Sequence, residues 1–81
     1  MQTDEELMQA VRDGSESAFE AILARHQGGV YGFFLRMTHN SATAEDQAQE
    51  VFVRLFRNAA TYCPSAKFTT YLYTLARHVW L

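Results

Sequence analysis

Apolar side chains recur at steps of three and four residues along nearly the whole chain, which is the period of an α-helix. The longest series, which includes one histidine, consists of Phe19, Ile22, Leu23, His26, Val30, Phe33, Phe34 and Met37. It continues through Gly28-Gly29, so these glycines are predicted to loosen or kink a long helix rather than to end it. No long alternation of polar and apolar residues indicates a strand, and 81 residues are enough for one domain only. The sequence therefore predicts an all-α domain, a small bundle of about four helices.

Capping signals mark where the first two helices begin. Thr3-Asp4-Glu5-Glu6 has the form of a capping box, and Gly14 is predicted to end a first helix over about residues 4–13. Ser17-Ala18-Phe19-Glu20 repeats the capping-box spacing, so the second helix is predicted to open there. His39-Asn40-Ser41 supplies the exit from this second helix.

The third helix is predicted from about Thr43 to about Asn58, with Glu45 and Asp46 in its first turn, where acidic side chains interact favourably with the helix dipole. Winding it at about 100° per residue gives a face that is predicted to be buried, with Ala48, Val51, Phe52, Leu55, Phe56 and Ala59. The opposite face is a narrow stripe, here called the third-helix stripe, made of Asp46, Gln49, Glu50, Val53 and Arg57.

The only proline lies in Tyr62–Lys67, which is predicted to be a loop before the last helix. That helix begins near Phe68 and is expected to bury Phe68, Leu72, Leu75 and Val79. Its opposite side carries Thr70, Tyr73, Thr74 and Arg77, with Trp80 at the margin. Because Tyr73 and Trp80 fall outside the apolar series, packing does not readily explain them.

Charged residues are unevenly distributed, although the net charge is only −2. Residues 1–40 carry three basic and six acidic side chains. From Val51 onward the chain has no acidic side chain, and its basic ones are Arg54, Arg57, Lys67 and Arg77. A polyanion is therefore expected to meet the C-terminal third of the chain. An ordinary uneven surface remains an open interpretation of the charges taken alone.

Enzyme and metal chemistry find little support in the sequence. Cys63 is the only cysteine, which excludes a disulfide within the chain and a cysteine-based zinc site. No two histidines stand at the spacing of a metal-binding helix, and His26 is better interpreted as a core residue. Asp46 and Glu50 are one turn apart, but nothing nearby would desolvate them. We therefore predict no catalytic residue, no metal and no cofactor, so that a small enzyme or metal protein is the least favoured interpretation.

The sequence also predicts where the protein acts in the cell. No apolar run is long enough to cross a membrane, and no basic segment followed by an apolar one opens the chain. With a single cysteine, this favours a cytoplasmic protein with no membrane insertion.

Two surfaces remain as candidates for binding. The third-helix stripe places carboxylates and an arginine around Val53, which suits docking against a partner helix, although a solvated helix face also explains it. The second surface mixes aromatic, hydroxyl and basic side chains: Tyr62, Lys67, Phe68, Thr69, Thr70, Tyr71, Tyr73, Arg77 and Trp80. Such a mixture is typical of single-strand recognition, because bases stack on aromatic faces, hydroxyls read base edges and cations hold phosphates.

At these residues the chain resembles a known family. Asp46-Gln47-Ala48-Gln49-Glu50-Val51-Phe52, followed by Arg54-Leu55-Phe56-Arg57, is similar to the second conserved region of bacterial RNA polymerase sigma factors. The run from Tyr62 to Tyr73, followed by Ala76-Arg77, resembles the adjoining promoter-melting region. The opening, from Asp4-Glu5-Glu6-Leu7 through Gly14 to Ala18-Phe19-Glu20, is similar to the start of the extracytoplasmic-function (ECF) subgroup of the sigma-70 family. The three motifs agree in order and spacing over nearly the whole chain.

The resemblance implies a single sigma factor region 2 domain over residues 1–81, without the helix-turn-helix domain that reads the −35 element. It implies that the third-helix stripe (Asp46, Gln49, Glu50, Val53 and Arg57) binds the coiled-coil clamp helices of the RNA polymerase β′ subunit. It also implies that flipped bases of the −10 non-template strand are captured by Tyr62, Lys67, Phe68, Thr69, Thr70, Tyr71, Tyr73, Thr74, Arg77 and His78. An anti-sigma factor is a further implied partner.

The chain departs from the family pattern at several positions. Tyr71 stands where the small subgroup usually has Trp, and Tyr keeps a stacking surface. Cys63 replaces a common acidic or polar residue, His78 stands where Asn is usual, and Gly28-Gly29 replaces a typical Pro-Arg. These changes affect a base contact at His78 and the bend of the second helix. The main alternative function is a helical protein–protein module that binds polymerase or a regulator without recognising DNA.

Overall fold

Helices make up most of the chain, which the computed structural model describes over residues 1–81. The elements, in order, are α1 (Asp4–Arg12), α2 (Glu16–Thr38), α3 (Ser41–Arg57), the short 3₁₀ helix η1 (Ala59–Thr61) and α4 (Phe68–Trp80). No strand is present, so the predicted all-α class with four helices is confirmed. None of these helices combines the length and the apolarity that a membrane span requires.

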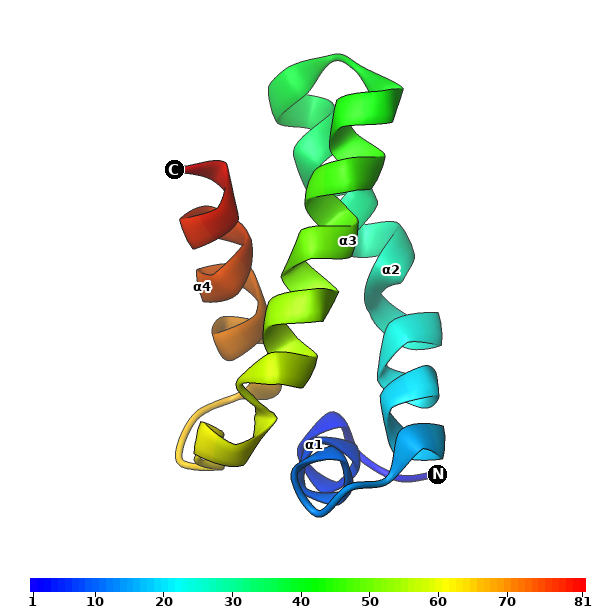
Figure 1. Ribbon diagram of the computed structural model, residues 1–81, viewed down its shortest axis with the longest axis vertical. Coiled ribbons are helices and arrows are strands. Elements are labelled where there is room, and N and C mark those ends of the chain that lie inside the picture. Colours follow the sequence, from blue (N-terminus) through cyan, green and yellow to red (C-terminus); the bar gives the residue numbers. More distant parts are fainter.

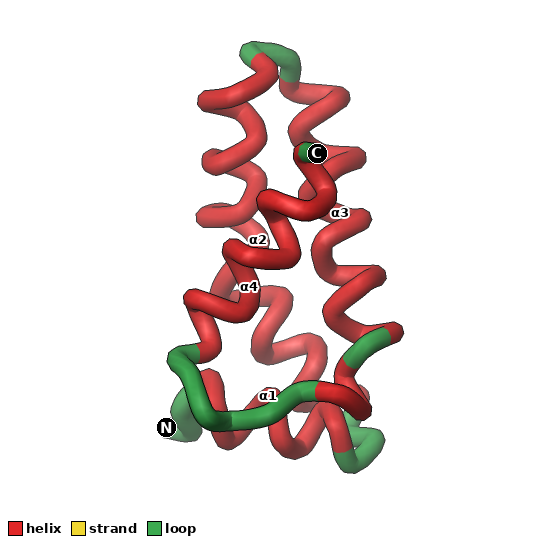
Figure 2. Tube along the Cα trace, turned by 90° about the vertical axis from the view of Figure 1, so that its left-hand side faces the viewer, coloured by secondary structure: helices red, strands yellow, loops and turns green.

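α2 and α3 form a long antiparallel pair, and the other two helices pack around it (Figure 1). α4 lies across one face of this pair, mainly against α3, and α1 crosses its base (Figures 1 and 2). Figure 2 also shows the loop before α4 running along α1. α3 therefore has α2 on one side and α4 on another, and both candidate surfaces adjoin it.

The first two helices begin at side-chain caps, of which the sequence predicts one correctly. Thr3 N–H donates to Glu6 Oε1 at 2.8 Å and Glu6 N–H donates to Thr3 Oγ1 at 3.1 Å, so the predicted capping box is formed. The prediction for α2 is wrong by two residues, because Ser15 rather than Ser17 caps the helix and accepts a first-turn N–H at 3.1 Å. Gly14 adopts a left-handed φ of 99° and turns the chain at once, so α2 begins as soon as that turn is complete.

α2 continues through Gly28-Gly29, as predicted. His39 ends it with a left-handed φ of 53°, and the Asn40 side chain caps α3 by accepting a first-turn N–H at 2.9 Å. Because this cap starts α3 two residues earlier than predicted, Glu45 and Asp46 lie beyond its first turn. That turn contains no acidic side chain, so the predicted interaction of these two residues with the start of the helix is wrong.

The core is formed by apolar side chains and one tyrosine, and every element contributes to it. Its members are Leu7, Met8, Val11, Ala18, Ile22, Val30, Phe34, Ala44, Ala48, Val51, Phe52, Leu55, Ala59, Tyr62, Phe68, Leu72 and Ala76. Three predictions of burial need correction, because Phe56 is exposed and Leu75 and Val79 are only half-buried. On α4 the buried row runs at steps of four and ends at Ala76, whereas the sequence predicted Leu75 and Val79 in its place. Helical winding defines the apolar arc, but it does not determine how much of that arc a neighbouring helix covers.

Candidate functional site

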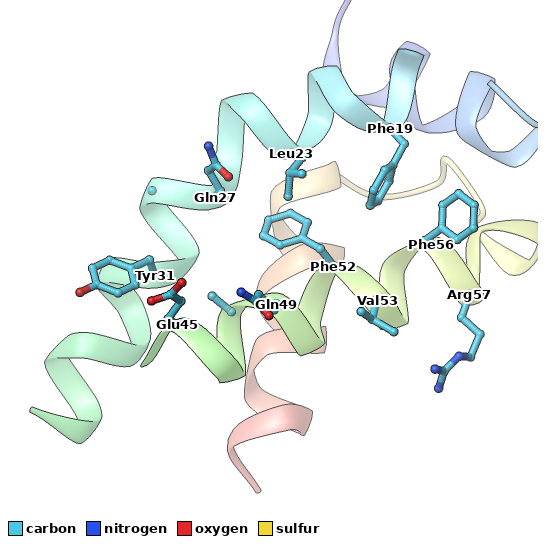
Figure 3. A pocket seen from close by; sticks show the side chains of 12 residues that line it. Phe19, Leu23, Gln27, Tyr31, Glu45, Gln49, Phe52, Val53, Phe56 and Arg57 are labelled. Carbon is cyan, nitrogen blue, oxygen red and sulfur yellow. The ribbon is translucent and has the colours of Figure 1, made fainter. Parts of the chain in front are cut away.

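A groove of about 1080 Å³ runs between α2, from Phe19 to Tyr31, and the outer side of α3 (Figure 3). Phe19 and Leu23 point toward it from α2, and Phe52, Val53 and Phe56 lie opposite them on α3. Most of the lining is apolar, with glutamine, glutamate and arginine side chains among the remaining members. An apolar centre with polar margins is the composition of a protein–protein interface.

The third-helix stripe borders this groove. Three of its five members line it: Gln49, Val53 and Arg57. Val53 is 44% exposed, which is unusual for a branched apolar side chain and agrees with its predicted outward position. Asp46 is exposed, and Glu50 is half-exposed. The Glu50 carboxylate accepts a hydrogen bond from Arg54 Nε at 2.9 Å, one turn along the helix. A partner that forms an ion pair with Glu50 must therefore compete with Arg54 for the carboxylate.

Phe56 is the groove residue that the sequence pattern assigned to the wrong face. It is 55% exposed, and its ring lies edge-to-face against Phe19 with centroids 5.1 Å apart. Glu16 and Glu20 border the same end of the groove. The sequence does contain a signal for the exposure of Phe56. Residues three apart on a helix are separated by about 60°, so Phe56 lies next to Val53, which was predicted to face outward.

The second candidate surface consists of the loop Tyr62–Lys67 and the outer side of α4. Its exposed side chains include Cys63, Lys67, Thr69, Thr70, Arg77 and His78. The Thr74 hydroxyl is used within the helix, since it donates to the Thr70 carbonyl at 2.7 Å and accepts from Arg77 Nη2 at 3.5 Å. The side chain and backbone of Ser65 lower the pKa of the Cys63 thiol by stabilising its thiolate. This surface offers two cations and several hydroxyls to a ligand.

Several side chains predicted to bind DNA belong to the interior instead. Phe68 is fully buried and Tyr62 is 2% exposed, so neither offers a side-chain surface to a ligand. Tyr73 is half-buried, with its ring edge-to-face against Phe33 of α2 at 5.7 Å. The expectation that packing does not explain Tyr73 is therefore wrong, because α4 meets α2 as well as α3. Trp80 remains 40% exposed.

Tyr71 lies at the boundary between the core and the loop. It is half-buried, and its ring lies 5.2 Å from that of Tyr62 and 6.2 Å from that of Phe68. The hydroxyls of Tyr62 and Tyr71 are buried without a hydrogen-bond partner. Burial raises the pKa of both phenols, and the charge of Glu5 raises that of Tyr62 further. The rings of Tyr62 and Phe68 thus pack against Tyr71 on its core side.

A small polar cluster joins α1 to α2. His26 Nε2 lies 3.0 Å and Arg25 Nη1 3.2 Å from the same carboxylate oxygen of Asp4. Burial raises the pKa of Asp4, but His26 and Arg25 together more than reverse this effect, so the pKa is lowered. The His26 ring also packs against Phe68 at 5.2 Å, as expected for a histidine at the edge of the core. No group of three histidine, cysteine, aspartate or glutamate side chains comes together in a way that could hold a metal ion.

The family model described as Sigma-70 region 2 matches residues 22–81. The chain belongs to this family. The match includes most of α2, all of α3, the loop and α4, so the resemblance of the two motifs in α3 and in the loop with α4 is confirmed.

Curated relatives agree with this membership. The chain is 42% identical over 69 residues to the RNA polymerase sigma factor CarQ of Myxococcus xanthus, a match that covers 85% of this chain and 40% of CarQ. It is 35% identical over 69 residues to the ECF RNA polymerase sigma factor SigW of Bacillus subtilis, with 85% of this chain and 37% of SigW covered. The region 2 chain thus spans less than half of the length of these relatives.

A solved structure has the same fold. The NMR structure of an engineered region 2 of sigmaE in complex with GTAAAA superimposes with a TM-score of 0.88 and 29% sequence identity. The match covers 96% of this chain and 81% of that one. All of the elements described above therefore occur in the arrangement of a region 2 domain.

Proposed function

We propose that this region 2 domain acts in transcription initiation by binding RNA polymerase and the −10 promoter element. The groove and the third-helix stripe dock on the clamp helices of the β′ subunit, and the loop with α4 captures bases of the non-template strand. The observation that carries the proposal is the similarity of 96% of the chain to a region 2 domain solved in complex with GTAAAA.

The groove supports the polymerase-binding half of the proposal. Phe56 and Val53 expose apolar surface beside Phe19, and acidic side chains border it at Glu16 and Glu20. An amphipathic helix with basic flanks complements such a surface, because its apolar face fills the groove and its cations meet the carboxylates. Regulation by an anti-sigma factor in the cytoplasm belongs to the same proposal, since a helix that covers this groove excludes the clamp helices.

The exposed part of the second surface supports the DNA-binding half. Lys67, Arg77, Thr69 and Thr70 are exposed. In this proposal the two cations hold phosphates and the two hydroxyls contact base edges. Tyr71 offers the aromatic surface on which a base can stack. In this proposal the buried Tyr62 and Phe68 do not contact DNA but fix Tyr71. His78 is exposed on the same helix and takes part in base selection, whereas Thr74 contributes through its bond to Arg77.

Promoter opening then requires binding alone. Unstacking a base costs a few kcal/mol, and a preformed aromatic and polar site can offset that cost. If the domain binds the single strand better than the duplex, it shifts the population toward the melted state. No covalent step, catalytic residue or cofactor takes part.

The proposal is tested with a single-stranded oligonucleotide library whose central segment is randomised. The domain selects from the library with and without the purified β′ coiled coil, and the bound strands are sequenced. We expect one short motif to be enriched, more strongly with β′ present, and the enrichment to be lost in Tyr71→Ala and weakened in Lys67→Ala. Binding to β′ without any enrichment would instead identify the domain as a protein–protein module.

Reversing a charge in the stripe tests the docking surface. Glu50→Lys is expected to weaken β′ binding by about tenfold while the domain stays folded, because an exposed helical ion pair contributes only about 0.3–0.5 kcal/mol to stability. The matched control is the swap Glu50→Lys with Arg54→Glu, which keeps the net charge and an ion pair. If the swap restores binding fully, the loss in Glu50→Lys came from the helix itself and the assigned surface is wrong. Isothermal titration calorimetry measures the β′ affinity of each variant, and circular dichroism checks that each variant is folded.

A further inference from the structure

α1 lies beside the loop that the proposed function uses for base capture, although it contains none of the predicted binding residues. The family model matches residues 22–81, so α1 is also outside that match. Figure 2 shows the loop Tyr62–Lys67 running along α1 before it enters α4. The contacts between α1 and this loop give the helix a role beyond packing.

Two side chains of α1 hold the two ends of the loop. At its start, Arg12 Nη1 donates to the Tyr62 carbonyl oxygen at 3.2 Å. At its end, the Phe68 N–H donates to Glu5 Oε2 at 2.7 Å. Glu5 and Arg12 are seven residues apart, which is two helical turns, so they lie on one face of α1 about 10 Å apart along its axis. A single rigid helix therefore fixes both anchor points of the loop.

The bond from Glu5 also supplies the cap that α4 lacks. Lys67 occupies the N-cap position of α4 and makes no side-chain hydrogen bond to the helix. Glu5 reaches across from α1 and accepts an N–H at this helix start, where a negative charge interacts favourably with the helix dipole. The short distance of 2.7 Å is typical of a charge-assisted hydrogen bond. The first residue of α4 is therefore held by α1, and the direction of the helix with it.

α1 is itself fixed to the rest of the domain. Leu7, Met8 and Val11 are buried in the core. Asp4 contacts Arg25 and His26 of α2 at 3.2 and 3.0 Å. Because these contacts hold α1 against the core and α2, α1 cannot move freely. A displacement of the loop is therefore opposed by the whole domain.

We propose that α1 is a brace for the base-capture loop, and that Glu5 and Arg12 are positioning residues that set where Lys67 and Tyr71 meet the strand. The inference rests on the proposed function, because it assigns a purpose to the loop. It predicts that base selectivity depends on two residues that never touch DNA.

The first test measures the loop without any DNA. Amide hydrogen exchange is followed in the 81-residue chain and in Glu5→Ala and Arg12→Ala. In Glu5→Ala we expect the Phe68 amide to exchange about ten times faster relative to α3 core amides, as for a lost charge-assisted bond. Gln9→Ala is the matched control, because Gln9 is an exposed residue of the same helix whose side chain makes no hydrogen bond to the loop. An unchanged Phe68-to-core ratio in Glu5→Ala would overturn the brace.

The second test measures selectivity. An oligonucleotide enriched by the wild-type domain and a copy with one changed base are titrated against each variant. A loss of folded protein alone lowers both affinities equally, whereas a displaced loop lowers their ratio. We expect the ratio to fall about tenfold in Glu5→Ala, less in Glu5→Gln, which keeps an acceptor oxygen, and not at all in Gln9→Ala. An unchanged ratio in Glu5→Ala and Arg12→Ala would refute the positioning role. If the wild type enriches no sequence, the proposed function fails, and the exchange ratio still decides whether the brace exists.

Discussion

The tyrosine hydroxyls beneath the loop are unusual groups in this core. The hydroxyl of Tyr62 is buried and has no hydrogen-bond partner, while its ring packs edge-to-face on Tyr71. A buried polar group without a partner lowers stability, and an apolar replacement of the same shape removes that effect. Tyr62→Phe is therefore expected to leave the free energy of unfolding unchanged or to raise it by up to about 1 kcal/mol.

Urea unfolding measures this change, with Tyr62→Leu as the control that loses the ring contact as well. Tyr62→Leu should destabilise the domain by more than about 1 kcal/mol. If Tyr62→Phe destabilises it to a similar extent, the hydroxyl has a partner and the description of this part of the core is wrong.

Asp4 gives the domain a predictable response to acid. The pKa of its carboxyl is lower in the folded chain than in the unfolded chain, because His26 and Arg25 outweigh the effect of burial. As the pH falls, the unfolded state therefore takes up the proton first, and the contribution of Asp4 is lost as the pH falls below about 4. Urea unfolding of the wild type and Asp4→Asn, from about pH 7 down to about pH 3, should show a difference that shrinks with acid. A difference that stays constant over this range would exclude the assigned ionic contact.

Single residues show which part of the site the sequence could predict. Val53 was predicted to face outward because its angle on α3 depends only on helical geometry, and the structure agrees. Tyr62 and Tyr73 were predicted to contact DNA because they belong to a mixed aromatic, hydroxyl and basic surface, and Tyr73 also lies outside the apolar series of its helix. Tyr62 is buried with its ring against Tyr71 of α4, and Tyr73 is half-buried against Phe33 of α2. Both contacts join separate segments of the chain, so no local pattern contains them.

At the scale of an element, α2 is a long helix that tolerates two adjacent glycines in its middle. A Cβ added at Gly28 would meet no atom within 4 Å, whereas one at Gly29 would lie 2.9 Å from the Tyr73 hydroxyl. Gly28→Ala should therefore raise the free energy of unfolding by about 0.5–1 kcal/mol, since alanine restricts the unfolded chain and favours the helix. Gly29→Ala should gain less, because Tyr73 must move.

Denaturant unfolding of these two variants decides between local and tertiary explanations of the glycines. Equal gains would show that the Tyr73 hydroxyl moves freely, and a loss in Gly28→Ala would show that α2 needs a flexible centre. The path of α2 through the glycines followed from the apolar period on both sides of them. Its start did not, because Ser15 and Ser17 are both good caps and the left-handed turn at Gly14 selects the first.

At the scale of the whole molecule, the fold divides the basic C-terminal third between two surfaces. Arg54 pairs with Glu50 at 2.9 Å, and Arg57 lines the groove, so we assign both to the groove side of α3. Lys67 and Arg77 are exposed on the loop and α4, on the other side (Figure 1). The four basic side chains that are close in the sequence therefore do not form one continuous positive surface. The domain should therefore bind a single strand weakly by itself, and in the proposed function the polymerase contributes the remaining affinity.

This division can be measured as a salt dependence. Each phosphate contact to a single strand contributes about −0.7 to the slope of the logarithm of affinity against the logarithm of salt concentration, so two contacts give about −1.4. Lys67→Ala should reduce the slope to about −0.7, and Arg57→Ala should leave it unchanged because that cation faces the groove. Fluorescence anisotropy of a labelled strand at several salt concentrations gives the slope for each variant. A wild-type slope steeper than about −3 would mean that Arg54 and Arg57 also contact phosphates, and the strand would then have to cross α3 rather than follow α4.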